Sequence, residues 1–485
     1  MICFGATQFL MLQSGTPPTV NYVSLVGVPL DDVYIHCQYA SNLLHGYSFS
    51  FNPGETLTAD TSPLWVSLIA IGGLFTSRLE LIAITLSILS YLIIAPGVYR
   101  ASRDVFGLSE SHARIAGWAA VLCSRLAWSG MSGMETALSA LLMLLTVEEH
   151  MRSRQRNILR GREAVWLGLG LLARPEFVFV AVVCALDWLW VGIRKQTDTR
   201  NVPMVGCLLL AIASPALLLP MVTQDHFMSH SSLVQGAHIS ILPNINYLWF
   251  AIKVIASNNV VLFGLAAAGL FASWKKDNTT FVFVIAVGLP ILQSFVAPQF
   301  RHHGRYFFSV FPLIIILGVS GWSAFEQRLT HLTRWRTGIA FALLFAGAME
   351  TGRWSLIAAE SVRNINDQHL AAVDWLRTNM RPTDILAVDD VGAIGYYLGH
   401  PVIDLTGLVS PSIWSLHSNQ DSVWEAARSA RATLFVIYNR LNPTFFSHHH
   451  DSLLLQAQFR VRLPLASSAD TILSIYRVKE AEHGS

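Results

Sequence analysis

Apolar segments repeat along the first 350 residues of the chain, and they constrain the fold more than any other feature. They lie at about 63 to 76, 79 to 99, 113 to 128, 134 to 147, 163 to 173, 177 to 192, 203 to 222, 247 to 272, 279 to 297, 306 to 324 and 337 to 350. Hydrophobic residues make up 53% of the 485 residues and charged residues only 13%, about half the share found in soluble domains. Because about 20 apolar residues in a helix span a bilayer, the sequence predicts a polytopic α-helical membrane protein.

The first 30 residues do not fit this pattern. Met1 to Leu12 is apolar but shorter than a membrane span, and Pro17-Pro18 follows it. No basic region precedes it, as one would in a signal peptide. We expect residues 1–30 to be a short or truncated apolar segment, either because the true start of the chain lies upstream or because a first membrane helix is incomplete.

The positions of lysine and arginine predict the orientation in the membrane. Three loops, at 152–162, 194–200 and 328–336, are strongly basic, and 100–114 and 275–276 are basic to a lesser degree. Basic residues accumulate in cytoplasmic loops, and these five share one face if the segment 63–76 does not cross. The transmembrane domain, residues 63–355, then crosses the membrane ten times. The loop 31–62 contains no lysine or arginine, so we expect it and the C-terminal part to lie outside the cytoplasmic membrane.

Charge and cysteine content narrow the function classes. The net charge is +2, so nothing indicates nucleic acid as a partner. The five cysteines stand singly, mostly in apolar runs, without the paired spacing of a disulfide framework or a zinc site. We expect them to be core residues.

Two adjacent carboxylates begin the most polar stretch of the chain. Asp31 and Asp32 precede a helical pattern that Gly46 would end, so Asp31 reads as the N-cap and Asp32 as a first-turn residue. Ordinary capping is one interpretation of the pair. The positive end of the helix would also keep the carboxylates ionised, as a base or a cation ligand requires.

The chain changes character at about residue 360. A helical pattern at 365–380 precedes strand-like runs at 385–388, 402–405, 433–438 and 471–478, which predicts a small α/β domain over 360–485. The segment 390–397 contains two glycines and is predicted to be a tight turn rather than a phosphate-binding loop. The run His448-His449-His450 is predicted to be a solvated loop rather than a metal site.

Several short runs resemble one enzyme superfamily, in the same order along nearly the whole chain. They are Asp31-Asp32-Val33-Tyr34-Ile35 with Tyr39-Ala40, Asn42-Leu43 and Gly46, then Phe51-Asn52-Pro53-Gly54-Glu55, Thr61-Ser62-Pro63-Leu64-Trp65, Gly133-Met134-Glu135-Thr136, Ala173-Arg174-Pro175-Glu176, Gly304-Arg305-Tyr306-Phe307, the segment 390–397 and Asp404-Leu405-Thr406-Gly407. These runs resemble the GT-C superfamily glycosyltransferases, most closely the cell-wall arabinofuranosyltransferases and their uncharacterised relatives.

The resemblance implies an enzyme that moves one sugar from a polyprenyl-phosphate donor to an acceptor outside the cytoplasmic membrane, usually with inversion. The acceptor would be a glycan, a lipid or a protein. In such enzymes the acidic pair of the first outer loop, residues 31–62 here, is the catalytic centre. The sequence departs from its relatives at Gln38, where they usually carry arginine, so either His36 compensates or the site differs.

The chemistry of this reaction selects candidate residues. It needs a carboxylate to accept the proton of the acceptor hydroxyl, positive charge for the departing phosphate, and an apolar groove for the lipid. We expect Asp31 to be the general base and Asp32 its supporting carboxylate, since an N-cap residue has more freedom to face a substrate. The candidates for binding the donor phosphate are Arg301, His302, His303, Arg305, Arg174 and His36. The candidates for binding the acceptor or substrate are Tyr34, Asn52, Glu55 and Glu135.

Other interpretations stay open at this stage. Residues 301–305 could anchor the chain to lipid headgroups, and Arg174-Pro175-Glu176 could be a self-paired helix break. A divalent metal held by Asp31 or Asp32 with a histidine or glutamate is allowed, although no spacing demands one. The whole protein could instead be a transporter or flippase of lipid-linked sugars, or a non-catalytic scaffold.

Overall fold

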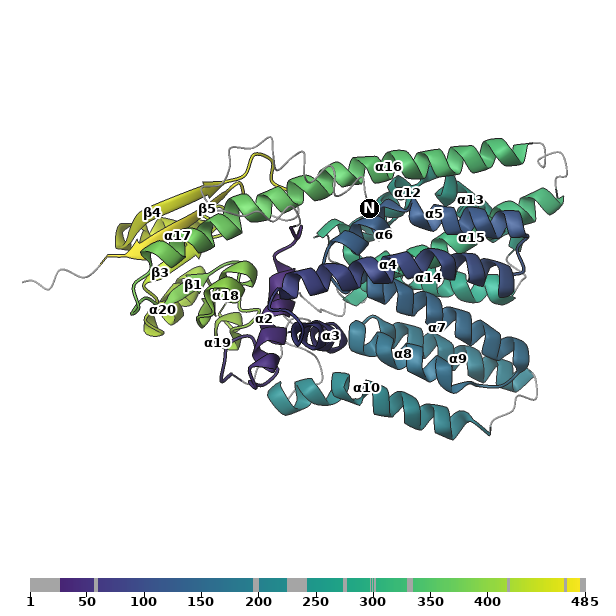
Figure 1. Ribbon diagram of the computed structural model, residues 1–485, viewed down its shortest axis with the longest axis horizontal. Coiled ribbons are helices and arrows are strands. Elements are labelled where there is room, and N and C mark those ends of the chain that lie inside the picture. Colours follow the sequence, from purple (N-terminus) through teal and green to yellow (C-terminus); the bar gives the residue numbers. More distant parts are fainter. Residues whose placement is uncertain are drawn as a thin grey trace, which may run out of the picture.

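The computed structural model describes residues 27–55, 60–194, 200–224, 242–273, 277–296, 298, 300, 302–328, 335–416, 419–465 and 469–479. Figure 1 shows an elongated molecule with a helical bundle at one end and an α/β domain at the other. The predicted short or truncated apolar segment, residues 1–30, lies outside the described residues except for residues 27–30.

Every predicted apolar segment is helical. The helices of the bundle are α2 (Asp32–Leu44), α3 (Pro63–Gly73), α4 (Leu79–Asp104), α5 (Glu110–Val121), α6 (Ser124–Met131), α7 (Thr136–Arg156), α8 (Gly161–Ala173), α9 (Phe177–Arg194), α10 (Val202–Gln224), α12 (Ile245–Asn258), α13 (Val260–Ser273), α14 (Asp277–Val296), η1 (His302–Val310), α15 (Phe311–Arg328) and α16 (Arg336–Asn364). The prediction of a mostly helical protein with several apolar helices is confirmed.

Three helices among the described residues are long and apolar enough to cross a membrane: α4, α14 and the joined helix 303–328. Helices α12 and α13 add a fourth if they form one span, which is bent by 113° at a short break. Helix α3 has 11 residues, and at 1.5 Å per residue it reaches roughly half the thickness of a hydrocarbon core. This length agrees with a segment 63–76 that does not cross, while the count of ten crossings remains a prediction.

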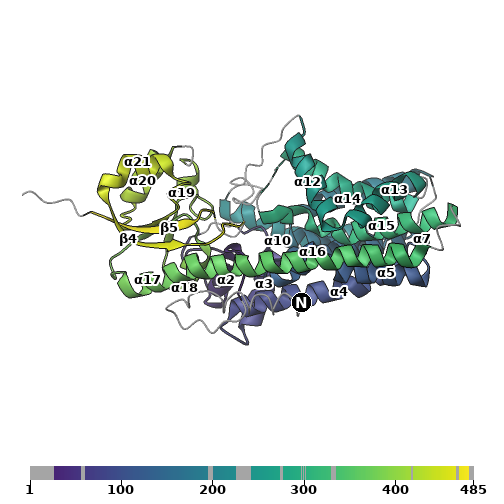
Figure 2. The ribbon, with the colours of Figure 1, turned by 90° about the horizontal axis from the view of Figure 1, so that it is seen from above.

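One continuous rod joins the two parts of the molecule. Helix α16 runs into a π-helix, η3 (Ile365–Leu370), and then into α17 (Ala371–Asn379). Figure 2 shows this rod extending along the bundle and into the α/β domain. The helix predicted at 365–380 is therefore the last part of a much longer element.

The C-terminal domain contains a five-stranded sheet with the order β2-β1-β3-β5-β4. Its strands are β1 (Leu386–Val388), β2 (Val402–Asp404), β3 (Leu434–Ile437), β4 (Leu453–Arg460) and β5 (Ile472–Val478). Strand β1 pairs in parallel with β2 and β3, and β5 pairs antiparallel with β3 and β4. The four predicted strands are confirmed, and β4 was not predicted.

Short helices complete the domain, and three of them lie where the sequence predicted a turn or a loop. They are α18 (Gly392–Leu398), α19 (Pro411–Trp414), α20 (Gln420–Ser429), α21 (Pro443–His449) and η4 (His450–Ser452). The segment 390–397 was predicted to be a tight turn, but most of it forms α18. The three histidines were predicted to be a loop, but they lie in α21 and η4, where His448 and His449 pair with Asp421.

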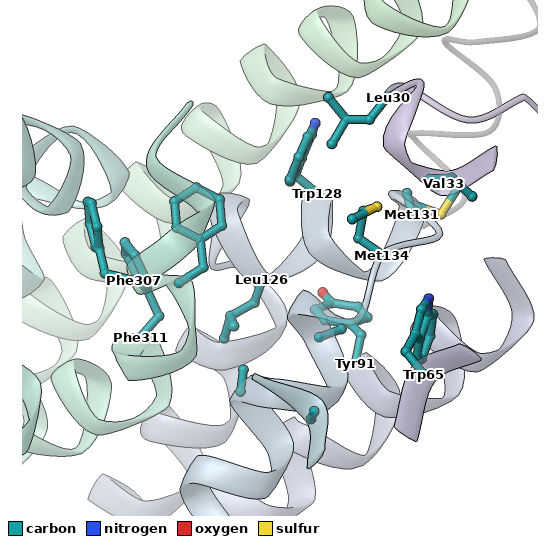
Figure 3. Packing of buried hydrophobic residues seen from close by; sticks show 14 of the residues in the cluster. Leu30, Val33, Trp65, Tyr91, Leu126, Trp128, Met131, Met134, Phe307 and Phe311 are labelled. Carbon is teal, nitrogen blue, oxygen red and sulfur yellow. The ribbon is translucent and has the colours of Figure 1, made fainter. Parts of the chain in front are cut away.

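A buried apolar cluster packs against the first loop, residues 31–62. Figure 3 shows side chains of this cluster from α2, α3, α4, α6 and η1, among them Trp65 and Trp128, which are almost inaccessible to solvent. Val33, in the first turn of α2, is part of it and is fully buried. Burying such large side chains contributes several kcal/mol, which fixes the start of α2 against the bundle.

Candidate active site

The carboxylate of Asp31 caps a helix of the other domain instead of its own. Asp31 makes no side-chain capping bond to α2. Its two oxygens accept hydrogen bonds from the backbone N–H groups of Gly392 and Ala393, each at 2.8 Å, across 361 and 362 residues of sequence. Those N–H groups begin α18 and have no partner within that helix. The expected capping role of Asp31 is therefore real but serves α18.

The start of α18 must be glycine for this contact. A Cβ atom at Gly392 would lie 2.3 Å from the Asp31 carbonyl oxygen and 2.4 Å from a carboxylate oxygen. A Cβ atom does not come this close to an atom to which it is not bonded, so any larger residue would push the two elements apart. The contact leaves Asp31 9% exposed. Burial raises the pKa of Asp31 to about 6, with the nearby Asp390 adding to the shift and His369 opposing it.

Asp32 faces a different partner. Asp32 is the first residue of α2. Its side chain forms an ion pair with Arg305, 273 residues away, and is one-third exposed. Arg305 itself is 6% exposed, and its Nε and Nη1 atoms are buried without a hydrogen-bond partner. A buried guanidinium with two unpaired donor atoms is poised to receive an oxyanion, because a buried N–H group without a partner is costly and arginine binds carboxylate and phosphate strongly.

Backbone geometry at the start of η1 aims Arg305 inward. His303 and Gly304 both have positive φ angles, 60° and 81°, which is easy for glycine and uncommon for histidine. The resulting kink brings Arg305 beside Asp32 while His303 turns away, its ring 4.9 Å from that of Trp354. Of the predicted cationic cluster, Arg305 reaches the acidic pair and His303 does not. Arg301 and the side chain of His302 lie outside the described part of the chain.

A second network of charged residues lies beside the Asp32–Arg305 ion pair. His36 contacts Asp60 through Nδ1 at 2.5 Å and Glu135 through Nε2 at 3.3 Å, and Glu135 also pairs with Arg174. Arg174 pairs in addition with Glu176 at 2.7 Å, so the predicted self-pairing occurs, together with a longer-range bond. Burial opposes the charge on His36, but its two carboxylate partners outweigh that effect and raise its pKa to about 10.

Tyr306 connects the two networks. The guanidinium groups of Arg174 and Arg305 each lie 5.4 Å from the centre of its ring. An aromatic face attracts cations, which allows the two like charges to stay near each other. His36, Glu135, Arg174 and Arg305, four of the predicted residues, are thus brought together at the acidic pair.

The remaining predicted residues join the first loop to the C-terminal domain. The Asn52 side chain donates to the Val402 carbonyl and accepts from the Val402 N–H, both at 3.1 Å, as a neighbouring strand would. Asn52 also donates to Glu55 at 3.2 Å. The ring of Tyr34 lies 5.9 Å from Tyr396 and 5.2 Å from Tyr397, centre to centre.

Gln38 stands where the resembling enzymes usually carry arginine. Its side chain bonds within the first loop. Its Nε2 donates to the Phe51 carbonyl at 3.1 Å, and Asn42 donates to the same oxygen at 2.8 Å. The two amides hold the first loop against α2. The predicted substitute for the arginine, His36, is engaged by Asp60 and Glu135.

His369 also belongs to the site, although the sequence did not indicate it. This residue is fully buried in the π-helix η3, and its Nε2 contacts Asp390 at 3.1 Å and the Tyr438 hydroxyl at 3.2 Å. Burial lowers the pKa of His369, whereas the nearby carboxylates of Asp31 and Asp390 raise it. The net effect is a raised pKa. A π-turn leaves no mark in the hydrophobic period, although such turns are frequent at functional sites, so no pattern could have singled out His369.

No metal-binding geometry occurs at the acidic pair within the part of the chain that the structure describes. Among the described residues, the one group with three converging metal-ligand atoms lies elsewhere. It consists of His150, Glu163 and Cys184, in α7, α8 and α9.

Together, a helical bundle with apolar spans, an appended α/β domain and an acidic loop between them define a multi-pass membrane protein. Its fold is similar to that of solved GT-C glycosyltransferases. The crystal structure of ArnT from Cupriavidus metallidurans bound to undecaprenyl phosphate superposes with a TM-score of 0.62, 11% identity, and coverage of 98% of this chain and 97% of that one. The apo form of the same protein gives 0.61 at 12% identity over the same shares.

Two other solved structures are similar. The oligosaccharyltransferase from Archaeoglobus fulgidus in its apo form gives a TM-score of 0.59 at 13% identity, over 90% of this chain and 69% of that one. The arabinofuranosyltransferase AftD from mycobacteria gives 0.48 at 16% identity, over 99% of this chain and 40% of that one. Residues 363–476 match a family model described as a domain of unknown function, DUF8728. No curated protein has a matching sequence.

Proposed function

We propose that this protein is a glycosyltransferase that moves a sugar from a polyprenyl-phosphate donor to a glycan, lipid or protein acceptor outside the cytoplasmic membrane, with inversion. The observation that carries this proposal is the Asp32–Arg305 pair, in which a partly exposed carboxylate meets a buried guanidinium with two unused donors. A base and an oxyanion receptor in contact are what displacement of a phosphate from an anomeric carbon requires.

Arg305 is the proposed receptor for the donor phosphate. Its guanidinium, whose Nε and Nη1 atoms are unpaired, would turn to bind the phosphate oxygens as negative charge builds up on the leaving group. Arg174 and His36, already engaged by Glu135, Asp60 and Glu176, add positive charge nearby without an open donor pair of this kind. Binding at a buried arginine strengthens the interaction because water screens it less.

Asp32 is the proposed general base, and Asp31 is the proposed positioning residue. This reverses the division of labour expected from the sequence, because Asp31 is held by two N–H groups at α18 whereas Asp32 is one-third exposed. In the proposed reaction the acceptor hydroxyl attacks the anomeric carbon from the face opposite the phosphate. Asp32 takes the hydroxyl proton, a new glycosidic bond forms, and the bond to the polyprenyl phosphate breaks. When Arg305 turns to the phosphate, the carboxylate of Asp32 loses its ion pair and becomes a stronger base.

Two structural neighbours support the choice of donor. One is ArnT bound to undecaprenyl phosphate, and the other is the Archaeoglobus oligosaccharyltransferase in complex with an inhibitory peptide and a dolichol-phosphate. The proposed topology places the acidic pair and the C-terminal domain on the outer face of the membrane, opposite the basic loops. A lipid-linked donor in the outer leaflet would then reach Asp32 and Arg305 without crossing the bilayer.

Binding of undecaprenyl phosphate to the purified protein tests the donor site. We expect native mass spectrometry in detergent to detect the bound lipid, and Arg305→Gln to weaken binding by at least tenfold, as loss of about 1.4 kcal/mol would. Arg114→Gln is the matched control, since the Arg114 side chain is 69% exposed and pairs with Glu110 one helical turn away. Equal binding by both variants would contradict the proposal. Binding without sugar transfer would favour the flippase or scaffold interpretation.

A further inference from the structure

A buried group of metal-ligand atoms lies at the end of the bundle away from the acidic pair. His150 is on α7, Glu163 on α8 and Cys184 on α9, and all three are buried. One ligand atom from each lies within 4.8 Å of the others. Fifteen residues of α7 separate His150 from Glu135, roughly 22 Å at 1.5 Å per residue. Figure 1 shows α7, α8 and α9 packed together, extending away from the α/β domain.

The surroundings of His150 fix which nitrogen can bind an ion. Its Nε2 lies 3.0 Å from a carboxylate oxygen of Asp187, and that oxygen is also 3.2 Å from Arg154 Nε. Phe281 stacks on the imidazole ring at 4.4 Å between centres, with the two planes 10° apart. A carboxylate that accepts the Nε2 proton leaves the lone pair on Nδ1, which faces Glu163 at 2.6 Å. This is the carboxylate–histidine arrangement that orients a histidine ligand toward a metal.

Glu163 has unused capacity at the same point. Its Oε1 accepts from Trp188 Nε1 at 3.2 Å, while Oε2 is buried without any hydrogen-bond partner. A buried carboxylate oxygen with no partner carries a large desolvation penalty. Cys184 is a buried free cysteine beside the histidine.

From this geometry we infer that His150, Glu163 and Cys184 bind one zinc ion, with Asp187 orienting the histidine. One nitrogen, one thiolate and one carboxylate suit Zn²⁺, whereas Mg²⁺ and Ca²⁺ prefer oxygen ligands alone. The charges also balance in an apolar setting: the ion neutralises a thiolate and one carboxylate, and Arg154 neutralises Asp187. Such an ion would clamp α7, α8 and α9 together and is separate from the proposed transfer chemistry.

The zinc content of the purified protein tests this inference. We expect about one zinc per chain by plasma mass spectrometry after purification without chelators, falling to background in Cys184→Ser. Cys207→Ser is the matched control, because Cys207 is exposed and lies outside the group, and it should keep its zinc. Asp187→Asn should retain the site but bind zinc about 10- to 100-fold more weakly.

Cobalt substitution tests the site in the wild-type protein, so the result does not depend on whether a variant folds. Wild-type protein loaded with Co²⁺ should show near-ultraviolet absorption from thiolate-to-cobalt charge transfer. The alternative occupant of the site is a proton, which would make His150 an imidazolium paired with two carboxylates. Absence of zinc in the wild type together with absence of the cobalt band would establish that alternative, and zinc retained in Cys184→Ser would overturn the ligand set.

Discussion

Gly392→Ala is predicted to loosen the joint between the first loop and the C-terminal domain. The added Cβ would lie 2.3 Å from the carbonyl oxygen of Asp31 and 2.4 Å from its carboxylate, so the two elements must separate. Hydrogen bonds to a charged group contribute about 1.5–3 kcal/mol each, and Asp31 accepts two. Alanine returns about 1 kcal/mol of helix propensity. The net local loss should therefore be at least about 2 kcal/mol.

Hydrogen exchange measures this loss where it occurs. A drop of about 2 kcal/mol in opening free energy corresponds to roughly 30-fold faster amide exchange, which we expect in peptides from α18 and the start of α2. Gly352→Ala is the control, because its Cβ in α16 would meet no atom within 4 Å. Unchanged exchange in Gly392→Ala, or the same change in both variants, would refute the role assigned to Asp31.

Three further predictions concern charge and topology. A reporter fused after residue 156 should be cytoplasmic and one fused after residue 404 outside; both on one face would contradict the proposed orientation. Because the folded-state pKa of His36, about 10, exceeds its ordinary value of 6.5, its stabilisation is complete below about pH 6.5 and is lost as the pH rises through about 10. The difference in unfolding temperature between wild type and His36→Gln should accordingly shrink from pH 7 to pH 10, and a constant difference would exclude the ion pairs as its cause. Arg174→Ala leaves Glu135 buried with one fewer partner and should destabilise the fold by about 3–5 kcal/mol, seen as lost monodisperse protein in size-exclusion chromatography, whereas the exposed Arg114→Ala should not.

The sequence predicted the helices and most of the sheet because those elements depend on local pattern. Long apolar runs can only be helices in a bilayer, and β1, β2, β3 and β5 are short apolar runs next to turn residues. Strand β4 was missed because it is an exposed edge strand with a register shift between Leu455 and Ala457, so its side chains do not alternate. Helix α18 was missed because it has only seven residues and starts with glycine.

The candidate site was predictable in its residue types but not in its pairings. Asp31 and Asp32 were identified as a pair, yet their partners Gly392 and Arg305 are more than 270 residues away, and only the folded chain shows which acid meets which. The prediction that Asp31 is the base rests on its N-cap position, and no local pattern shows that its carboxylate caps α18 of the other domain. The zinc ligands likewise come from three separate helices, where no sequence spacing can reveal them.

Sugar transfer by Asp32→Asn tests the proposed mechanism most directly. The assay uses protein in vesicles, supplied with radiolabelled sugars on polyprenyl phosphate and with a membrane extract as the source of acceptors. The mechanism predicts a rate about 10²- to 10⁴-fold below wild type with binding of undecaprenyl phosphate retained. Asp451→Asn, whose side chain is 92% exposed, should transfer at the wild-type rate. A transfer rate for Asp32→Asn within a few-fold of wild type would contradict the assignment of Asp32 as the base.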